Sequence, residues 1–267
     1  MAYTGKSLQY KSAFPNTTLL LSLSLSCKLC LCVPGLQTAF LTHLILILSH
    51  PGHTYAASSH EVIKDIWSKT REQMLSVKKE LTSSNAGADL KIRMGDTPGC
   101  SVVEDLTGVN EISAGNFVFF DLMMARNTKV CKDEDVAVCV ACPVVQKKEQ
   151  ECKVIIHGGA VHFSKDSMMF TPADGKPPER YFGELVFLSE DGSWSKPCPR
   201  KDVRLQSISQ EHGILRVFDK EVLKRIEIGD VVGILPIHSC LTADAMKMYH
   251  TIATRKKYKH AQYDSYA

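Results

Sequence analysis

The sequence predicts an α+β protein in which a short stretch of alternating helix and strand precedes a mainly antiparallel β domain. Residues 58–87 carry apolar side chains at helical spacing, and the segment ADLKIRMG that follows has the composition of a strand. Beyond Gly108 the helical spacing stops, and short apolar segments alternate with turns such as Glu190-Asp-Gly. The length of 267 residues allows one large domain or two of ordinary size.

The first 48 residues differ in composition from the rest. Up to residue 60 the charged side chains are Lys6, Lys11 and Lys28, which account for the whole net charge of +3. The balanced remainder indicates no basic patch for nucleic acid. Two apolar runs, 19–33 and 39–48, are each shorter than the roughly 20 residues of a membrane-spanning helix, so a membrane anchor is not favoured. A signal peptide, an organelle transit peptide and a mis-joined gene start remain open.

The predicted helix begins near Ser58 or Ser59, either of which can cap it. It ends at Asn85-Ala-Gly87, and the strand that follows leads into the Gly- and Pro-rich turn GDTPG. A helix, a strand and a polar turn form the repeating unit of α/β barrels and doubly wound sheets, in which ligands bind at that turn.

The segments beyond Gly108 predict strands because they are rich in β-branched and aromatic residues. DKEVLKRIEIGD and the last thirty residues offer short helical or coil pieces instead. The predicted strand segments are GNFVFFDLMM, VAVCVACPVV, CKVIIHGGAVHFS, YFGELVFLS, VRLQSIS, GILRVF and VVGILPI.

Ten cysteines are spread along the chain. Cys139 and Cys142 form a C-x-x-C inside an apolar strand segment, where cysteine is an ordinary small apolar filler. A redox or zinc site would need a following helix or a second pair. This usage favours a reducing compartment, so we expect a cytoplasmic protein, with organelle and secretory targeting left open by residues 1–48.

The stretch ILPIHSCLTAD carries His238 and Cys240 two positions apart. In an extended strand these side chains would project from the same face, close enough to share a zinc ion. A zinc site needs three or four ligands and this pair supplies two, so a buried core histidine and cysteine fit the pattern as well.

Six segments in order resemble the metal-activated, pyridoxal-phosphate-dependent D-serine dehydratase and D-threonine aldolase family, from about residue 49 to the C-terminus. The resemblance implies the last part of an alanine-racemase-like barrel at 49–110 and a D-serine dehydratase-like β domain with the metal site at 111–267. The matching segments are HPGHTY (50–55), GDTPGCS (95–101), ISAGNFVFFD (112–121), GGAVHFSKD (158–166), SQEHGIL (209–215) and GDVVGILPIHSCLTAD (229–244).

The resemblance implies a zinc ion on His238 and Cys240, which match both positions of the H-x-C pair in the dehydratase branch. Two protein ligands leave positions open for substrate, as a catalytic metal requires. The implied role is that of a Lewis acid on the β-hydroxyl of a D-amino acid.

The resemblance also implies pyridoxal phosphate contacts at Tyr55, Thr97, Gly115 and Asn116. The glycine-led turn would face the cofactor with its backbone N–H groups, because glycine allows close approach. For Thr97 and Gly115, ordinary turn chemistry fits nearly as well. Glu211 and His212 lie in another matching segment and receive no role; a buried, hydrogen-bonded pair is one reading.

The Schiff-base lysine of the family has no match here. Lys6, Lys11 and Lys28 occur in no comparable strand and turn, and a complete barrel takes about 250 residues. We therefore expect a truncated barrel whose helix exposes its apolar face, and residues 1–48 as a targeting segment or mis-joined start.

The implied activity is that of a lyase on D-amino acids, with a homodimer implied for the full-length family. D-serine dehydration to pyruvate and ammonia is our first expectation, because a cysteine ligand favours zinc. D-threonine cleavage to glycine and an aldehyde is the second expectation, and a non-catalytic, metal-binding fragment is the third.

Overall fold

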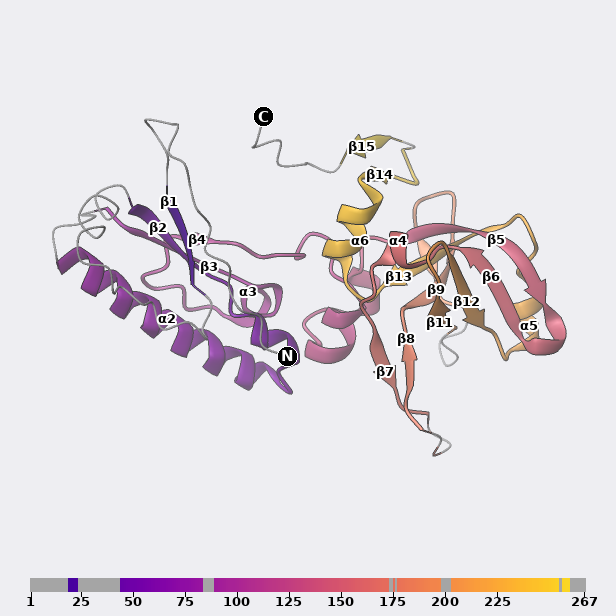
Figure 1. Cartoon of the computed structure of the whole chain (residues 1–267), viewed down its shortest axis with the longest axis horizontal. Coiled ribbons are helices and arrows are strands. Elements are labelled where there is room, and N and C mark those ends of the chain that lie inside the picture. The colour runs from indigo at the N-terminus through magenta and orange to yellow at the C-terminus, as the bar shows by residue number, and fades with distance from the viewer. Residues whose placement is uncertain are drawn as a thin grey trace. The chain divides into compact units, whose positions relative to one another are not determined.

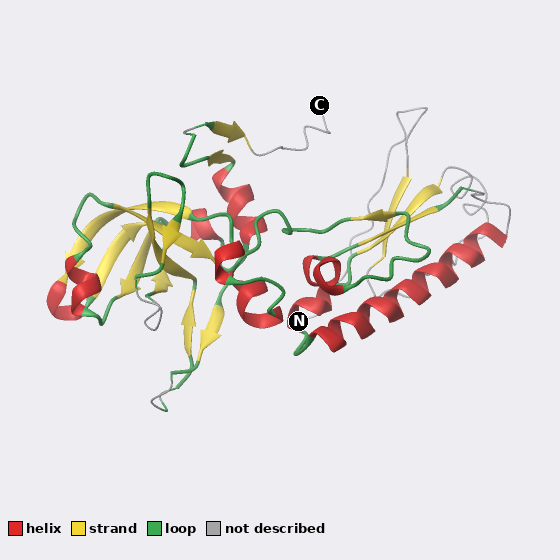
Figure 2. Cartoon of the chain, turned by 180° about the vertical axis from the view of Figure 1, so that it is seen from behind, coloured by secondary structure: helices red, strands yellow, loops and turns green. Residues whose placement is uncertain are grey.

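The computed structural model shows a chain of mixed helices and strands (Figure 1), which Figure 2 colours by type. Among the residues that the structure describes, no helix combines the length and apolar composition needed to cross a membrane. The predicted segment 1–48 falls largely outside the described residues, and so do Lys6, Lys11 and Lys28. The described residues are 19–23, 44–83, 89–172, 175, 177–197, 203–254 and 256–259.

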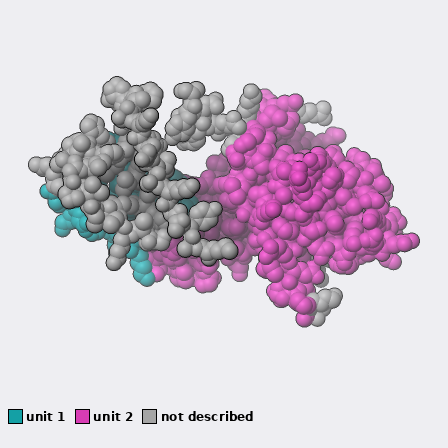
Figure 3. Space-filling view, in the orientation of Figure 1, with its two compact units in different colours: residues 1–51, 67–95, 105–113 teal, residues 52–66, 96–104, 114–267 magenta. Residues whose placement is uncertain are grey.

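The chain divides into two compact units that interleave along the sequence (Figure 3). The predicted domains are sequential, whereas residues 52–66 and 96–104 cluster with the C-terminal part of the chain. Unit 1 consists of residues 1–51, 67–95 and 105–113, and unit 2 consists of residues 52–66, 96–104 and 114–267.

Unit 1 contains, in its described part, a parallel four-stranded sheet in the order β1-β2-β3-β4. β2 crosses the boundary predicted at residue 48 and pairs in parallel with both β1 and β3. The alternating α/β pattern predicted for this region is therefore present as a small parallel sheet. Its strands are Leu19–Leu23 (β1), Leu44–Ser49 (β2), Lys91–Met94 (β3) and Glu111–Ile112 (β4).

Helix α2 (His60–Ser83) forms where helical spacing predicts it. Ser59 accepts a hydrogen bond from the Val62 N–H at 3.4 Å, as expected of a cap. The expectation that this helix exposes its apolar face was wrong. Trp67 and Met74 are buried, because the unit 1 part of α2 lies beside the parallel sheet (Figure 1).

Unit 2 is built on an antiparallel barrel that closes through six of its described strands. The strands follow the order β9-β11-β12-β6-β5-β13, and β13 pairs back onto β9. The predicted antiparallel domain is confirmed. The barrel strands are Val140–Lys148 (β5), Lys153–His157 (β6), Gly183–Leu188 (β9), Arg204–Ile208 (β11), His212–Arg216 (β12) and Val231–Pro236 (β13).

Shorter strands and helices complete unit 2. β10 pairs antiparallel with the end of β9, β7 pairs with β8, and β14 pairs with β15. These strands are Met168–Phe170 (β7), Glu179–Tyr181 (β8), Trp194–Ser195 (β10), Met248–His250 (β14) and Lys257–Lys259 (β15). The short helices are Gly52–Ala56 (η1), Thr97–Val102 (α3), Met124–Thr128 (η2), Asp133–Asp135 (η3), Glu149–Glu151 (η4), Ala160–Phe163 (α4), Lys220–Lys224 (α5) and Ser239–Met246 (α6).

β13 separates two apolar clusters. Ile234 packs with the buried residues of one cluster, whereas Leu235 and Ile237 pack in a second cluster with Leu122. Since neighbouring residues of a strand face opposite sides, β13 contributes to both. The end of β13 is thereby held on both faces, directly before His238.

The segment GNFVFFDLMM is not the predicted strand. It forms a turn in which Gly115 has a φ of +63° and Phe120 a φ of +50°, followed by the helical turn η2. The prediction failed because its aromatic composition is typical of strands. A left-handed conformation at Phe120 costs free energy, so the surrounding contacts must hold it in place.

We predict that Ile156→Ala destabilises the barrel by about 2–5 kcal/mol, because Ile156 is fully buried in the first cluster and its truncation leaves a cavity. Ile155→Ala is the matched control, since Ile155 is only half-buried on the opposite face of the same strand. Urea unfolding of both variants measures the difference. Equal losses would contradict the assignment of Ile156 to the barrel core.

Candidate functional site

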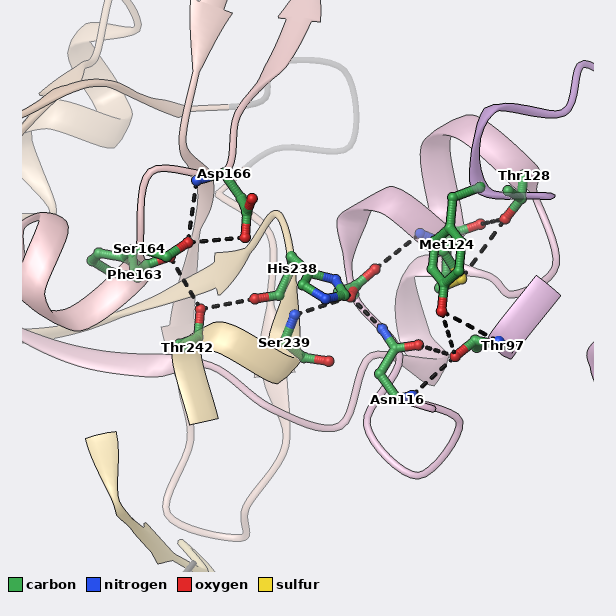
Figure 4. A network of polar contacts seen from close by, with 12 residues as sticks. Thr97, Asn116, Met124, Thr128, Phe163, Ser164, Asp166, His238, Ser239 and Thr242 are labelled. Carbon is green, nitrogen blue, oxygen red and sulfur yellow. Dashed lines mark hydrogen bonds and ion pairs between the residues drawn. The ribbon is translucent and has the colours of Figure 1, made fainter. Parts of the chain in front are cut away.

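The residues predicted from the sequence as cofactor contacts and metal ligands all belong to unit 2, and Figure 4 shows Thr97, Asn116 and His238 among them. They are supplied by η1, by the start of α3, by the turn before η2 and by the start of α6. The six residues are Tyr55, Thr97, Gly115, Asn116, His238 and Cys240.

Asp96 fixes Tyr55 and Thr97 relative to each other. Its buried carboxylate accepts hydrogen bonds from the Thr54 hydroxyl at 2.7 Å and from the Gly99 N–H at 2.6 Å. It thereby caps α3 and ties η1 to that helix. The Thr97 N–H then donates to the Tyr55 hydroxyl at 3.3 Å.

Thr97 also organises the glycine-led turn. Its Oγ1 lies 2.7 Å from the Ala114 carbonyl oxygen, accepts from the Asn116 N–H at 2.9 Å and contacts Asn116 Oδ1. A Cβ at Gly115 would lie 2.8 Å from Thr97 Oγ1, so glycine is required here for close approach as well as for its positive φ. The Asn116 N–H was expected to face the cofactor, but it donates to the Thr97 side chain instead.

Asp121 was missed in the sequence, and it connects the two predicted ligand sites. Its side chain is fully buried, and its Oδ2 accepts from Asn116 Nδ2 and from the Ser239 N–H at 2.9 Å. The same oxygen lies 3.2 Å from His238 Nδ1, and Oδ1 accepts from the Met124 N–H at 3.0 Å (Figure 4). The available signal is an acidic residue directly after the apolar run FVFF.

His238 and Cys240 do not lie on one extended strand, contrary to the prediction. β13 ends at Pro236, His238 is the N-cap residue of α6, and Cys240 lies in its first turn. The helix starts here because Asp121 satisfies the Ser239 N–H. The two side chains nevertheless lie close enough for Cys240 to contribute to the raised pKa of His238.

The buried Asp121 carboxylate, followed by Cys240, raises the pKa of His238 to about 10. An imidazolium at neutral pH must release a proton when a metal binds its nitrogen. The pKa of Tyr55 is also raised, chiefly by burial, so its phenol remains neutral and able to donate. The Tyr55 and His238 rings meet edge to face, with their centroids 6.5 Å apart.

The donor set at His238 fits a metal ligand. Asp121 engages Nδ1, which directs Nε2 outward as the ligating nitrogen, and a carboxylate behind a ligating histidine is the usual arrangement in metal sites. Cys240 is exposed and supplies sulfur. Within the described ranges no three His, Cys, Asp or Glu side chains are grouped to hold a metal, so this site would have two protein ligands.

The cofactor contacts also fit a phosphorylated ligand. The Tyr55 hydroxyl and the Gly115 turn present polar groups without a Cβ in the way, and the Tyr55 hydroxyl lies 3.4 Å from where that Cβ would be. Hydroxyls and glycine-led turns are common phosphate contacts.

Glu211 and His212 are exposed, so the reading of a buried pair was wrong. His212 faces His157 across the β12–β6 pairing, with the ring centroids 5.7 Å apart, and His157 lies 5.1 Å from His162. Burial and these neighbouring rings lower the pKa of His162.

Cys139 and Cys142 are separated by the barrel wall. Cys142 is buried in the first apolar cluster, whereas Cys139 packs against the second. This placement agrees with the reading of both cysteines as apolar filler.

Comparison with known proteins identifies the domain. Residues 137–252 match the family described as "Putative serine dehydratase domain". The chain carries a D-serine dehydratase-like domain. The matched residues include all six barrel strands and the pair His238 and Cys240.

Two curated relatives of this chain are dehydratases. D-threo-3-hydroxyaspartate dehydratase of Delftia sp. (strain HT23) is 27% identical over 78% of this chain and 52% of its own length. D-serine dehydratase of Dictyostelium discoideum is 27% identical over 77% of this chain and 50% of its own length. The chain spans about half the length of the curated relatives it matches.

Solved structures agree with this placement. A D-threo-3-hydroxyaspartate dehydratase with a cysteine-to-alanine substitution, in its metal-free form, has a TM-score of 0.67 at 25% identity, covering 82% of this chain and 56% of its own. A histidine-to-alanine mutant of that enzyme, substituted two positions earlier, has a TM-score of 0.64 at 27% identity, covering 78% and 51%. D-threonine aldolase from Filomicrobium marinum, at 19% identity and a TM-score of 0.62 over 86% and 57%, shows the fold alone.

We predict that iodoacetamide at about pH 8 modifies Cys240 before Cys139 and Cys142, and leaves Cys142 intact until the barrel unfolds. Burial raises the pKa of Cys139 to about 11 and that of Cys142 to about 12, so both remain protonated and unreactive, whereas Cys240 is exposed. Peptide mass spectrometry of native and urea-unfolded protein measures each rate. Equal rates for Cys142 and Cys240 in the native protein would exclude the barrel placement of Cys142.

Proposed function

We propose that this chain supplies the metal-ligand and cofactor-turn part of a pyridoxal-phosphate- and zinc-dependent lyase that acts on D-amino acids bearing a β-hydroxyl group. The observation that carries the proposal is the continuous polar network from Tyr55 and Thr97 through Asn116 and Asp121 to His238.

The relatives support a metal at this pair. In the solved D-threo-3-hydroxyaspartate dehydratase, the substituted histidine and cysteine are two positions apart, and the cysteine mutant is in a metal-free form. His238 and Cys240 have the same spacing. We assign the metal ligands to His238 and Cys240, with zinc favoured because thiolate is a soft ligand.

Dehydration is the reaction that we favour. The curated relatives described above are dehydratases of D-serine and D-threo-3-hydroxyaspartate, both β-hydroxy amino acids. The likeness to the aldolase extends to the fold alone. D-serine dehydration to pyruvate and ammonia is therefore our first choice, and retro-aldol cleavage of D-threonine to glycine and an aldehyde is the alternative.

Each side chain of the network has a role in this proposal. Pyridoxal phosphate, when bound, withdraws electrons from the substrate Cα, while zinc polarises the β-hydroxyl. His238 and Cys240 hold the cation, Asp121 fixes the His238 ring, and Gly115 gives the cofactor close access to Thr97 and Tyr55. The lysine of the family remains unassigned, and a homodimer remains part of the proposal.

A non-catalytic, metal-binding protein is the third candidate. It requires only that His238 and Cys240, with Asp121 behind His238, hold a cation. Zinc binding without turnover distinguishes this candidate from the two lyases.

We predict that His238→Ala abolishes stoichiometric zinc binding and lowers zinc-dependent pyruvate formation from D-serine by at least roughly 100-fold, since it removes a ligand rather than a supporting group. The full chain is assayed with zinc and pyridoxal phosphate, and a protein-free mixture corrects for cofactor chemistry. His212→Ala, an exposed histidine on β12, is the matched control.

The products decide between the candidates. Pyruvate from D-serine supports the dehydratase. Glycine from D-threonine without pyruvate from D-serine indicates the aldolase, and bound zinc without either product indicates the metal-binding protein. Full zinc binding by His238→Ala would reject the metal assignment in all three.

We predict that Gly115→Ala weakens binding of pyridoxine 5′-phosphate by roughly 10-fold or more, equivalent to about 1.4 kcal/mol. The added Cβ would lie 2.8 Å from Thr97 Oγ1 and displace it. Gly229→Ala is the control, because Gly229 also has a positive φ but open space around its Cβ position. Calorimetric titration measures the affinities, and equal effects of the two changes would remove the turn from the cofactor site.

A further inference from the structure

A single carboxylate oxygen joins the metal-ligand side of the site to the cofactor side. Asp121 Oδ2 accepts from Asn116 Nδ2, from the Ser239 N–H at 2.9 Å and interacts with His238 Nδ1 at 3.2 Å. A carboxylate oxygen has two lone pairs, so three donors on one oxygen must share them. A change in the strength of one donor therefore alters the other two.

The His238 side of this junction responds to a cation. When a metal binds Nε2, the electron density of the ring changes, and with it the strength of the Nδ1–H donor to the carboxylate behind it. Asp121 is fully buried, and hydrogen bonds in such a low-dielectric setting strengthen or weaken one another. The pull of a metal on His238 thus reaches Asp121 directly.

The Asn116 side responds to the cofactor. Asn116 is 2% exposed, and both its N–H and its Oδ1 contact Thr97 Oγ1, beneath the Gly115 turn. A ligand that settles on the Gly115 turn fixes Asn116, and Asn116 in turn presents its Nδ2 to Asp121. Fixing the contact between Asn116 and Thr97 therefore orients the hydrogen bond from Asn116 Nδ2 to Asp121.

The backbone holds Asp121 at this junction at a cost. Phe120, the residue before it, has a φ of +50°, a conformation that a bulky aromatic residue rarely adopts. The Phe120 N–H donates to the Asn116 carbonyl at 2.8 Å, and the Met123 N–H donates to the Ile237 carbonyl at 3.2 Å. The strained backbone is thus tied to the cofactor turn and to the strand end that precedes His238.

We propose that Asp121 is a positioning residue that couples the two ligands, so that a divalent cation at His238 and Cys240 and a phosphorylated pyridine at the Gly115 turn bind with linked affinity. This inference rests on the proposed function for the identity of the two ligands. By linkage, each ligand must change the affinity of the other in the same direction and by the same factor.

The test is calorimetric titration of the full chain with zinc, with and without saturating pyridoxine 5′-phosphate, which lacks the aldehyde that reacts with lysines. The coupling factor is the ratio of the two zinc affinities. We expect a factor of roughly 5 to 150 for the unaltered chain, the range of ordinary coupling. The reverse titration, with and without zinc, should give the same factor.

Two variants locate the coupling. Asn116→Ala should bring the coupling factor to about one, because it removes the link between the Gly115 turn and Asp121; pyridoxine 5′-phosphate is raised until the variant is saturated. Asp121→Asn should lose both the coupling and roughly 10- to 100-fold in zinc affinity. Far-ultraviolet circular dichroism and urea midpoints verify that both variants fold. If Asp121→Asn does not fold, Asn116→Ala tests the coupling on its own.

Glu184→Gln is the matched control, since Glu184 is an equally buried carboxylate of unit 2 that pairs with Arg126 at 2.8 Å and Lys196 at 2.9 Å. It should keep the full coupling factor. A factor of one in the unaltered chain, or full coupling in Asn116→Ala, would overturn the inference while leaving the proposed function intact. Absence of zinc binding to the unaltered chain would reject both.

Discussion

The buried carboxylate of Asp121 is the constraint on which the arrangement of the candidate site depends. A carboxylate removed from water is costly unless hydrogen-bond donors surround it. Those donors come from the Asn116 side chain, the Met124 and Ser239 backbones and the His238 ring. Burial of one charge therefore draws together a turn, a helical segment and the start of α6.

The barrel gives this arrangement a fixed support. β13 pairs with β5 on one side and with β9 on the other, so it closes the ring and also ends beside the site. Its two faces pack in different apolar clusters. A side chain mounted directly after such a strand has little freedom to drift, which is what metal coordination requires.

From the sequence, candidate site residues could be selected only where they occur in short motifs. His238 and Cys240, the glycine-led turn and Thr97 occur in short motifs, and the structure brings them together. The antiparallel domain was predictable because its strands are rich in β-branched and aromatic residues. Their closure into a barrel was not, because the pairing of β9 with β13 joins strands far apart in the chain.

Asp121 could not be assigned from the sequence because its interaction with His238 spans 117 positions. For the same reason the sequence placed His238 and Cys240 on an extended strand and not at the start of α6, where the Ser239 N–H is satisfied by that distant carboxylate. The aromatic run before Asp121 has strand composition, yet tertiary contacts hold Phe120 in a left-handed conformation. Where distant contacts override local preference, composition misleads.

The interleaving of the two units has a consequence for the inheritance of this site. Tyr55 and Thr97 belong to unit 2 through two separate segments, 52–66 and 96–104, and His238 and Cys240 belong to a third, 114–267. A gene fragment that begins after residue 104 would carry His238 and Cys240 without the hydroxyls of Tyr55 and Thr97. Recombination can transplant this centre only with the entire stretch of chain between residues 52 and 240.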